Sequence, residues 1–181
     1  MASRRHLSLP STAAFARLGI TFVIGLIADL WTKKLAVDRL ADPPADYVCI
    51  PGWLHFTYLP NYGAVFGAWQ GFRWFFVGVS VIAIGAVVWM FLESGRRRLY
   101  QVLLGMLLAG IIGNLYDRMA YGYVRDMIHA LPQWPKLFPW VFNVADSLLC
   151  VSIGTLIIYG LVFPDPPRAA ELRDASNADA R

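Results

Sequence analysis

Residues 74–92, WFFVGVSVIAIGAVVWMFL, decide the fold class because they contain no Asp, Glu, Lys or Arg. A helix needs about 20 mostly apolar residues to cross a hydrocarbon core about 30 Å thick, so this run is long enough to span a membrane. Residues 99–116 and 147–164 are likewise free of these charged side chains. A fourth apolar run, residues 13–35, carries charge only toward its two ends. We therefore predict four transmembrane helices.

The composition agrees with a membrane protein. Hydrophobic residues make up 57% of the 181-residue chain and charged residues 15%, against about 25% charged residues in a soluble domain. A soluble domain of this size could not bury that much apolar surface, and disorder requires the opposite composition. The net charge of +4 comes from short basic clusters beside apolar runs. Such clusters are typical of membrane orientation signals, so we expect no nucleic-acid partner.

The basic residues predict the orientation of the four spans, which we place at about 13–35, 72–92, 99–118 and 142–163. The short connection between the second and third spans carries Arg96, Arg97 and Arg98, and such loops lie on the cytoplasmic side. Four crossings then put both termini in the cytoplasm and leave two outer loops, residues 37–71 and 119–141. We predict one membrane domain over residues 1–163 and a disordered cytoplasmic tail over residues 164–181.

The first outer loop contains two runs of aromatic and β-branched residues, at 47–50 and 53–59, separated by Pro51 and Gly52. Such a pattern predicts a small pair of β-strands. The expected fold class is therefore all-α and integral to the membrane, with four transmembrane helices and a small extracytoplasmic β-element.

Polar residues gather at the predicted outer ends of the spans. Ionisable residues inside a membrane are costly, and each is a functional hypothesis by default. Here these polar residues fall near one membrane face, although the spans are placed from the apolar runs alone. The set comprises Asp29, Thr32, Lys33, Asn61, Asn114, Asp117, Arg118, Asp126, Asn143 and Asp146. This convergence predicts a site at the outer face.

Asp126 and Asp146 are the best candidates for chemistry because they flank the connection between the third and fourth spans. Two carboxylates close together in a low-dielectric site cannot both ionise, so one keeps a proton near neutral pH. The ionised group can deprotonate water, and the protonated one can polarise an amide carbonyl and protonate the leaving amine. Alternatively, Asp146 caps the fourth helix and Asp126 is a solvated loop acid.

Structural interpretations also exist for the neighbouring residues. Asp117 and Arg118 are consecutive, which we interpret as a structural ion pair at a helix end. Asp29 and Lys33 form an i,i+4 pair on one helix face, which would neutralise both charges. The asparagines at 114 and 143 could either bridge helices or orient the carboxylates, and their spacing does not separate these two roles.

Five sequence blocks together resemble one family. They are DLWTK at 29–33, NYGAVFG at 61–67, GNLYDR at 113–118, VRDMI at 124–128 and FNVADS at 142–147. In this order they resemble the lipoprotein signal peptidases, the type II signal peptidases of bacteria. One departure is Leu30, where the family often has Gln. The resemblance covers residues 13–163.

The resemblance implies an aspartic endopeptidase of the bacterial inner membrane, with its active site at the periplasmic face. Its substrates would be diacylglyceryl-modified prolipoproteins, cut just before the modified cysteine, with membrane lipid as the other partner. Asp126 and Asp146 map to the family's catalytic dyad. Supporting positions map to Asp29, Lys33, Asn61, Gly63, Asn114, Arg118 and Asn143. The family needs no metal and no cofactor, and a short surface helix would fit residues 64–69. We expect a monomer.

Two other function classes remain open from the residues alone. Membrane carboxylates also form proton relays, so a proton-coupled transporter is one alternative. A structural four-helix membrane subunit, with Asn and Asp joining the helices, is another. The presenilin type of intramembrane protease does not fit, because the sequence has no Gly-x-Gly-Asp motif.

Overall fold

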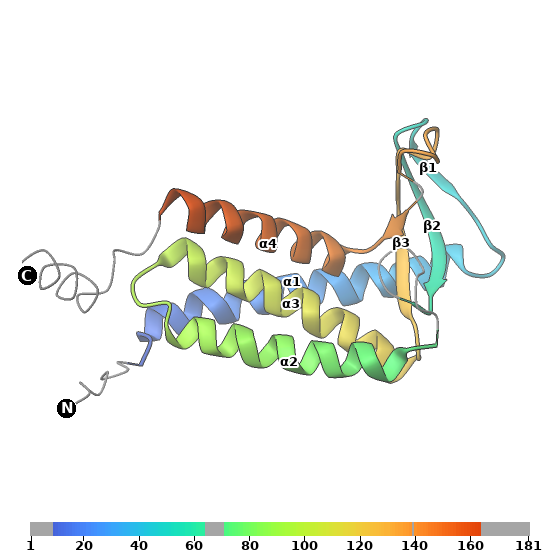
Figure 1. Cartoon of the computed structure of the whole chain (residues 1–181). Helices are drawn as coiled ribbons and strands as arrows, with labels where there is room; N and C mark the ends of the chain where they lie inside the picture. The colour runs from blue at the N-terminus through green and yellow to red at the C-terminus, as the bar shows by residue number, and fades with distance from the viewer. Residues whose placement is uncertain (1–8, 64–70, 139, 164–181) are drawn as a thin grey trace, which may run out of the picture.

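Four long helices lie side by side in the computed structural model, which describes residues 9–63, 71–138 and 140–163 (Figure 1). They are α1 (Thr12–Leu40), α2 (Arg73–Leu92), α3 (Arg98–Ala120) and α4 (Val144–Val162). Each is long and apolar enough to cross a membrane. The prediction of a helical membrane protein with four spans is confirmed.

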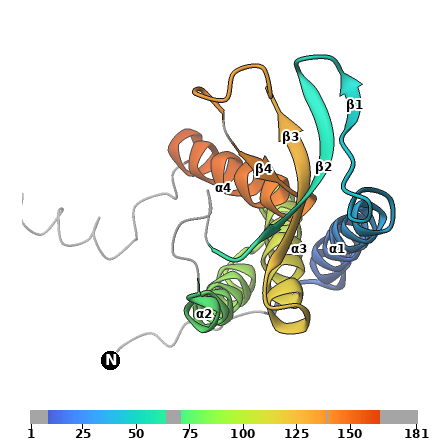
Figure 2. The same ribbon diagram turned by 90° about the vertical axis from the view of Figure 1, so that its right-hand side faces the viewer.

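An antiparallel four-stranded sheet lies across one end of the bundle (Figures 1 and 2). Its strands, in spatial order, are β1 (Tyr47–Ile50), β2 (Leu54–Asn61), β3 (Val124–Ala130) and β4 (Val141–Phe142). The predicted pair of strands is present as β1 and β2. Gly52 has φ +74° in the turn between them, a conformation that favours glycine. The sequence pattern did not predict β3 or β4.

Helix α3 is the centre of the bundle and contacts the other three helices. Glycines bring its backbone close to its neighbours. A Cβ added at Gly105 would lie 2.6 Å from the carbonyl oxygen of Leu18 on α1, and one added at Gly110 would lie 2.7 Å from that of Ala145 on α4. Small residues at such positions let membrane helices pack closely. The bundle therefore leaves little freedom for α1 and α4 to shift along α3.

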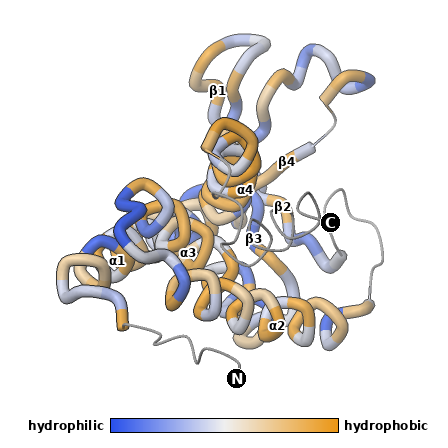
Figure 3. Tube along the Cα trace, turned by 60° about the vertical axis from the view of Figure 1, so that its left-hand side comes forward, coloured by the Kyte–Doolittle hydropathy of each residue, from blue (hydrophilic) through white to orange (hydrophobic). Residues whose placement is uncertain are grey.

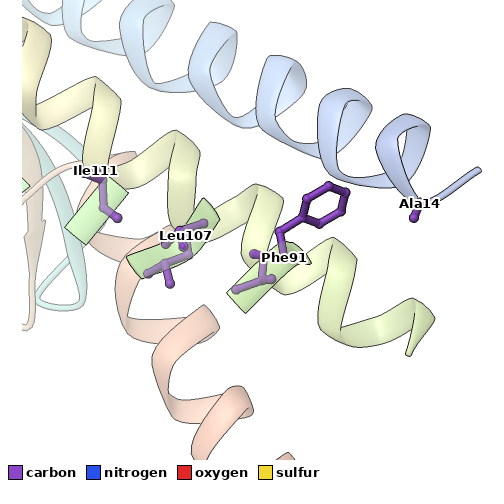
Figure 4. Close-up of a cluster of buried hydrophobic side chains, with 6 residues drawn as sticks. Ala14, Phe91, Leu107 and Ile111 are labelled. Carbon is purple, nitrogen blue, oxygen red and sulfur yellow. The ribbon is translucent and has the colours of Figure 1, made fainter. Parts of the chain in front are cut away.

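Apolar side chains fill the rest of the interior. A buried cluster joins α1, α2 and α3 and contains Ala14, Val87, Phe91, Leu104, Leu107 and Ile111 (Figure 4). Apolar residues also extend along the outer faces of the helices (Figure 3). Ile82 on α2 is 75% exposed and Leu161 on α4 is 78% exposed. Such apolar outer faces suit contact with lipid rather than with water.

Helix α1 ends at Leu40, about five residues beyond the predicted end of the first span. Lys33 and Lys34 therefore lie inside the helix and not at its end. Residues 36–40 continue the helix because none of them is Gly or Pro. Two expectations concern residues that lie outside the described part of the chain, the surface helix at 64–69 and the tail at 164–181.

Candidate active site

Asp126 lies on β3, which passes over the end of the helix bundle (Figure 2). It pairs across the sheet with Leu59 of β2, and only 1% of its surface is exposed. Asn61, at the end of β2, donates from Nδ2 to Asp126 Oδ2 at 2.9 Å. The interpretation of Asp126 as a solvated loop acid is therefore wrong, because the sheet buries this carboxylate.

Asp146 lies in the first turn of α4 and forms a reciprocal cap with Asn143. The backbone N–H of Asp146 donates to Asn143 Oδ1 at 2.9 Å, and the backbone N–H of Asn143 donates to Asp146 Oδ2 at 3.2 Å. The carboxylate thus caps the helix, as one interpretation held. Its other oxygen, Oδ1, accepts from Asn114 Nδ2 at 2.7 Å and faces away from the cap.

Asn143 joins the two carboxylates. Its side-chain Nδ2 donates to Asp126 Oδ1 at 2.6 Å, while its backbone N–H donates to Asp146 as above. Asn143 is fully buried, so one immobilised residue holds both acids. No described Lys, Arg or His forms an ion pair with either carboxylate. The negative charge on the pair is therefore stabilised by hydrogen bonds from neutral amides and not by a directly paired cation of the described residues.

Asn114, on α3, is oriented by Lys33. The Lys33 ammonium can only donate, and its Nζ lies 2.9 Å from Asn114 Oδ1. The Asn114 Nδ2 group is thereby directed to Asp146. Asn143 Nδ2 also reaches Asn114 Oδ1, at 3.3 Å. The two asparagines therefore both bridge helices and orient the carboxylates, so the two roles coincide.

Lys33 is fully buried and its charge is balanced by two acids. Its Nζ lies 2.7 Å from Asp29 Oδ2 and 3.4 Å from Asp117 Oδ2, which confirms the expected i,i+4 pair. Asp29 Oδ1 also accepts from the backbone N–H of Ala145 at 2.8 Å, joining α1 to the start of α4. Asp29 fits against α3 because Gly113 has no Cβ, since an added one would lie 3.1 Å from Asp29 Cγ.

The expected ion pair between Asp117 and Arg118 is wrong. Consecutive residues on a helix point in different directions, and Asp117 pairs instead with Arg125 of β3. The Arg125 guanidinium donates from Nη2 to Asp117 Oδ1 at 2.6 Å, and its backbone N–H donates to Asp117 Oδ2 at 2.9 Å. Neighbouring residues on a strand face opposite sides. By holding Arg125, this contact therefore fixes the side of β3 toward which Asp126 points.

Arg118 extends toward the connection after β2. Its guanidinium donates weakly, at 3.4 Å, to the carbonyl oxygens of Asn114 and Gly63, and it lies 5.1 Å from the ring centroid of Phe76. The backbone N–H of Gly63 donates to Asn61 Oδ1 at 3.0 Å. In the described structure, Gly63 and Arg118 therefore lie near Asp126 and Asp146 without forming a hydrogen bond to either carboxylate.

Burial raises the pKa of Asp126, and the charge of Asp146 raises it further, to about 7. Hydrogen bonds from Asn61 and Asn143 oppose this shift because they stabilise the ionised form. A carboxylic acid with such a pKa can hold or release a proton near neutral pH. This is the protonation behaviour that general acid–base catalysis requires.

The structure brings all nine predicted site residues into one connected region at the sheet end of the bundle. Sequence reasoning missed Gly113 and Arg125, which position Asp29 and Asp117. Both residues lie inside sequence blocks quoted above, at 113–118 and 124–128. Those blocks were the signal by which the two residues could have been found. Among the described residues, no group of three His, Cys, Asp or Glu ligands is arranged to hold a metal ion.

Comparison with known proteins identifies similar sequences. The family model described as signal peptidase (SPase) II matches residues 21–162. A lipoprotein signal peptidase of Caldanaerobacter subterraneus subsp. tengcongensis is 38% identical over 143 residues, which cover 77% of this chain and 93% of the relative. A lipoprotein signal peptidase of Caulobacter vibrioides is 36% identical over 150 residues, covering 80% of this chain and 84% of the relative.

Solved structures are also similar. A bacterial membrane enzyme determined by the in meso method at 2.3 Å resolution superposes with a TM-score of 0.75. It is 27% identical, and the match covers 85% of this chain and 93% of that one. The similarity therefore extends over the bundle and the sheet together.

Proposed function

This chain belongs to the lipoprotein signal peptidases, a family of aspartic endopeptidases, and we propose that Asp126 and Asp146 are its catalytic dyad. One observation carries the proposal: Asn143 holds both carboxylates at once, the buried Asp126 and the half-buried Asp146, and no described cation forms an ion pair with either. The transporter and structural-subunit alternatives are not retained, because family membership accounts for the same residues.

The dyad carries one proton near neutral pH. Asp126, with a pKa of about 7, titrates in the range where it can exchange that proton with its partner. The ionised carboxylate removes a proton from water as the water attacks the scissile amide carbonyl. The protonated carboxylate donates its proton to the carbonyl oxygen, which gives a gem-diol. The carboxylic acid formed by taking the water proton then donates that proton to the leaving amine. Collapse of the gem-diol to the carboxylic acid product returns one proton to the pair, which is again singly protonated. The apparent pKa values belong to the pair rather than to either residue.

The asparagines keep the two acids in place while they exchange roles. Asn61 and Asn143 donate to the two oxygens of Asp126, and Asn114 donates to Asp146. Amide donors carry no charge, so they stabilise an ionised carboxylate less strongly than Lys or Arg would. A cation in their place would lower the pKa of the carboxyl group and remove the proton that the reaction needs.

The substrates are prolipoproteins, and we propose that they are recognised in their diacylglyceryl-modified form. The dyad lies where the apolar helices meet the sheet, so a lipid anchor could stay beside the bundle while the peptide reaches the carboxylates.

This multi-pass bacterial membrane protein lies, we propose, in the inner membrane with its sheet on the periplasmic side. Arg96, Arg97 and Arg98 follow α2 at the end of the bundle away from the sheet, where α1 begins and α4 ends (Figure 1). By the positive-inside rule this end is cytoplasmic.

Cysteine labelling tests the orientation. Cys49 of β1 and Cys150 of α4 are both exposed free cysteines, so the test uses a Cys150→Ala background. Cys49 lies at the sheet end, and a membrane-impermeant maleimide should label it in intact spheroplasts. A Glu93→Cys variant that also carries Cys49→Ala provides the matched site at the opposite end. It should be labelled only after permeabilisation, and labelling of residue 93 from outside would reverse the orientation.

Peptide cleavage tests the activity and the dyad together. Purified protein in detergent should cut a diacylglyceryl-modified lipobox peptide before the modified cysteine, and should cut the unmodified peptide far more slowly. Asp126→Asn and Asp146→Asn variants should each cleave about 10²–10⁴-fold more slowly than wild type. An Asp38→Asn control removes an exposed carboxylate on α1 that pairs with Lys34 at 2.7 Å, and should cleave normally. Activity retained in either dyad variant would reject the proposed pair.

A further inference from the structure

The end of the bundle opposite the sheet contains a cavity that plays no part in the proposed reaction. Its volume is about 460 Å³. It lies between the start of α1 and the connection from α2 to α3. The residues that line it are Leu9, Pro10, Ser11, Ala13, Arg17, Gly95, Arg96 and Arg98. Three of these are arginines and, among the described residues of the lining, none is acidic.

Arg17 is held in a fixed position at this cavity. Its Nε donates to Gln101 Oε1 at 2.8 Å, and the fully buried Gln101 donates in turn to Ser94 Oγ at 3.2 Å and to the Gly95 carbonyl at 2.9 Å. Within the described chain, the two terminal amino groups of the guanidinium donate no hydrogen bond. A guanidinium held only by its Nε keeps its other donors available for an anion.

The arginine triplet divides into two roles. Arg97 turns back onto the protein: it donates to the carbonyl oxygens of Ser94 at 3.2 Å and Glu93 at 2.9 Å, and it lies 4.7 Å from the ring centroid of Tyr100. Arg96 and Arg98 line the cavity instead. Neither forms an ion pair or a side-chain hydrogen bond with another residue in the described ranges. Arg97 therefore stabilises the α2–α3 connection, and the side chains of Arg96 and Arg98 are available to bind a ligand in the cavity.

Backbone dipoles add to the positive field. Helices α1 and α3 both begin beside the cavity, at Thr12 and Arg98, and neither has an acidic residue in its first turn. The positive end of a helix dipole favours an anion. Three guanidinium groups and two helix starts thus surround one space, at the depth where the apolar spans end.

We propose that this cavity binds the phosphate group of an anionic phospholipid. Phosphate oxygens match the planar donors of Arg17, Arg96 and Arg98. Leu9 lines the cavity and is 79% exposed, and Phe15 in the first turn of α1 is 50% exposed; acyl chains would continue along these apolar side chains. Basic pockets between helices at the cytoplasmic surface suit anionic headgroups. The site would anchor the start of α1 to the α2–α3 connection.

Lipid titration tests the proposal on the full-length protein. Purified protein in a neutral detergent is titrated with dioleoylphosphatidylglycerol or, in parallel, with zwitterionic dioleoylphosphatidylcholine, and the rise in Tm is followed. Phosphatidylglycerol should raise the Tm at lower mole fraction than phosphatidylcholine. An Arg96→Gln/Arg98→Gln variant should need about tenfold more phosphatidylglycerol. A parallel titration with inorganic phosphate at matched ionic strength distinguishes a lipid from a soluble source.

The control removes the same charge elsewhere. An Arg39→Gln/Lys136→Gln variant loses two exposed cations at the sheet end and should respond to phosphatidylglycerol as wild type does. If both double variants needed the same increase in phosphatidylglycerol, the effect would depend on net charge alone, and the proposal would be overturned. Protection by inorganic phosphate alone would reject the lipid as ligand. The single Arg96→Gln variant, which leaves α3 untouched, should show an intermediate loss; no loss in either variant would also overturn the site.

Discussion

Two polar clusters are buried at opposite ends of the same apolar bundle, and they differ in what they can do. At the end away from the sheet, Gln101 ties Arg17 to Ser94 through neutral donors and acceptors. At the sheet end, the cluster includes two carboxylates that accept hydrogen bonds from amides, and no cation in the described part of the chain forms an ion pair with either. Buried polarity alone therefore does not indicate catalysis. The distinguishing feature is a pair of acids that cannot both ionise.

The largest expected contrast between the clusters is in catalysis. Asp126→Asn should lower the rate of peptide cleavage by about 10²–10⁴-fold, because the variant can neither accept nor deliver a proton. Gln101→Leu should leave cleavage unchanged, although it leaves the Arg17 Nε and the Gly95 carbonyl without their partner. Its free energy of unfolding should fall by about 1–3 kcal/mol. Cleavage rates and thermal unfolding of the two variants, measured side by side, check this. If both variants lost cleavage to a similar extent, the loss would reflect structural damage in each case and not a catalytic role of Asp126.

Lys33→Met tests whether the sheet-end cluster is balanced by its one buried lysine. Removing this cation leaves Asp29 and Asp117 without their shared partner, and breaking a buried pair in this way destabilises a protein by about 3–5 kcal/mol. It also frees the Asn114 amide to rotate away from Asp146. We expect a large fall in Tm together with loss of cleavage. A Lys34→Met control, one residue further along and 71% exposed, should change neither.

Gly113→Ala and Gly105→Ala separate packing from chemistry. Both add a Cβ where α3 touches α1: the first meets the Asp29 carboxylate and the second meets the Leu18 backbone carbonyl. Overpacking of this kind costs about 1–3 kcal/mol, so both variants should unfold at lower temperature. Only Gly113→Ala should also reduce cleavage, because it displaces the acid that holds Lys33 and the Ala145 backbone. Equal cleavage activity in the two variants would mean that Asp29 does not help to position the catalytic residues.

A further expected contrast is in the pH dependence of stability. The folded pKa of Asp126, about 7, lies above its ordinary value of 3.8, so the folded state binds its proton more tightly than the unfolded state. Stability should therefore fall as pH rises from about 4 to 7. The Asp126→Asn variant lacks this contribution, so its Tm should vary less over that window. An identical slope in wild type and variant would mean that Asp126 has an ordinary pKa.

Much of this architecture could be predicted from local sequence, and the failures have a common cause. Charge-free runs predicted the four helices, and the spacing of Asp29 and Lys33 predicted their ion pair. Strand β3 was missed because Arg125 and Asp126 interrupt its apolar pattern, and its pairing with β2 depends on residues far away in the chain. For the same reason the partner of Asp117 was assigned to its neighbour on α3 instead of Arg125 on the sheet. Long-range strand pairing leaves no local signal.

The central claim, that the two acids share one proton when the enzyme is active, is tested most directly by the pH profile of kcat/KM. Cleavage of the diacylglyceryl-modified peptide should be greatest below about pH 7 and should decline above the pKa of about 7 that burial and Asp146 give to Asp126. It should decline again at low pH, where both acids become protonated, giving a bell-shaped curve. A rate that stays constant from acid pH to well above neutrality would contradict a shared proton between Asp126 and Asp146.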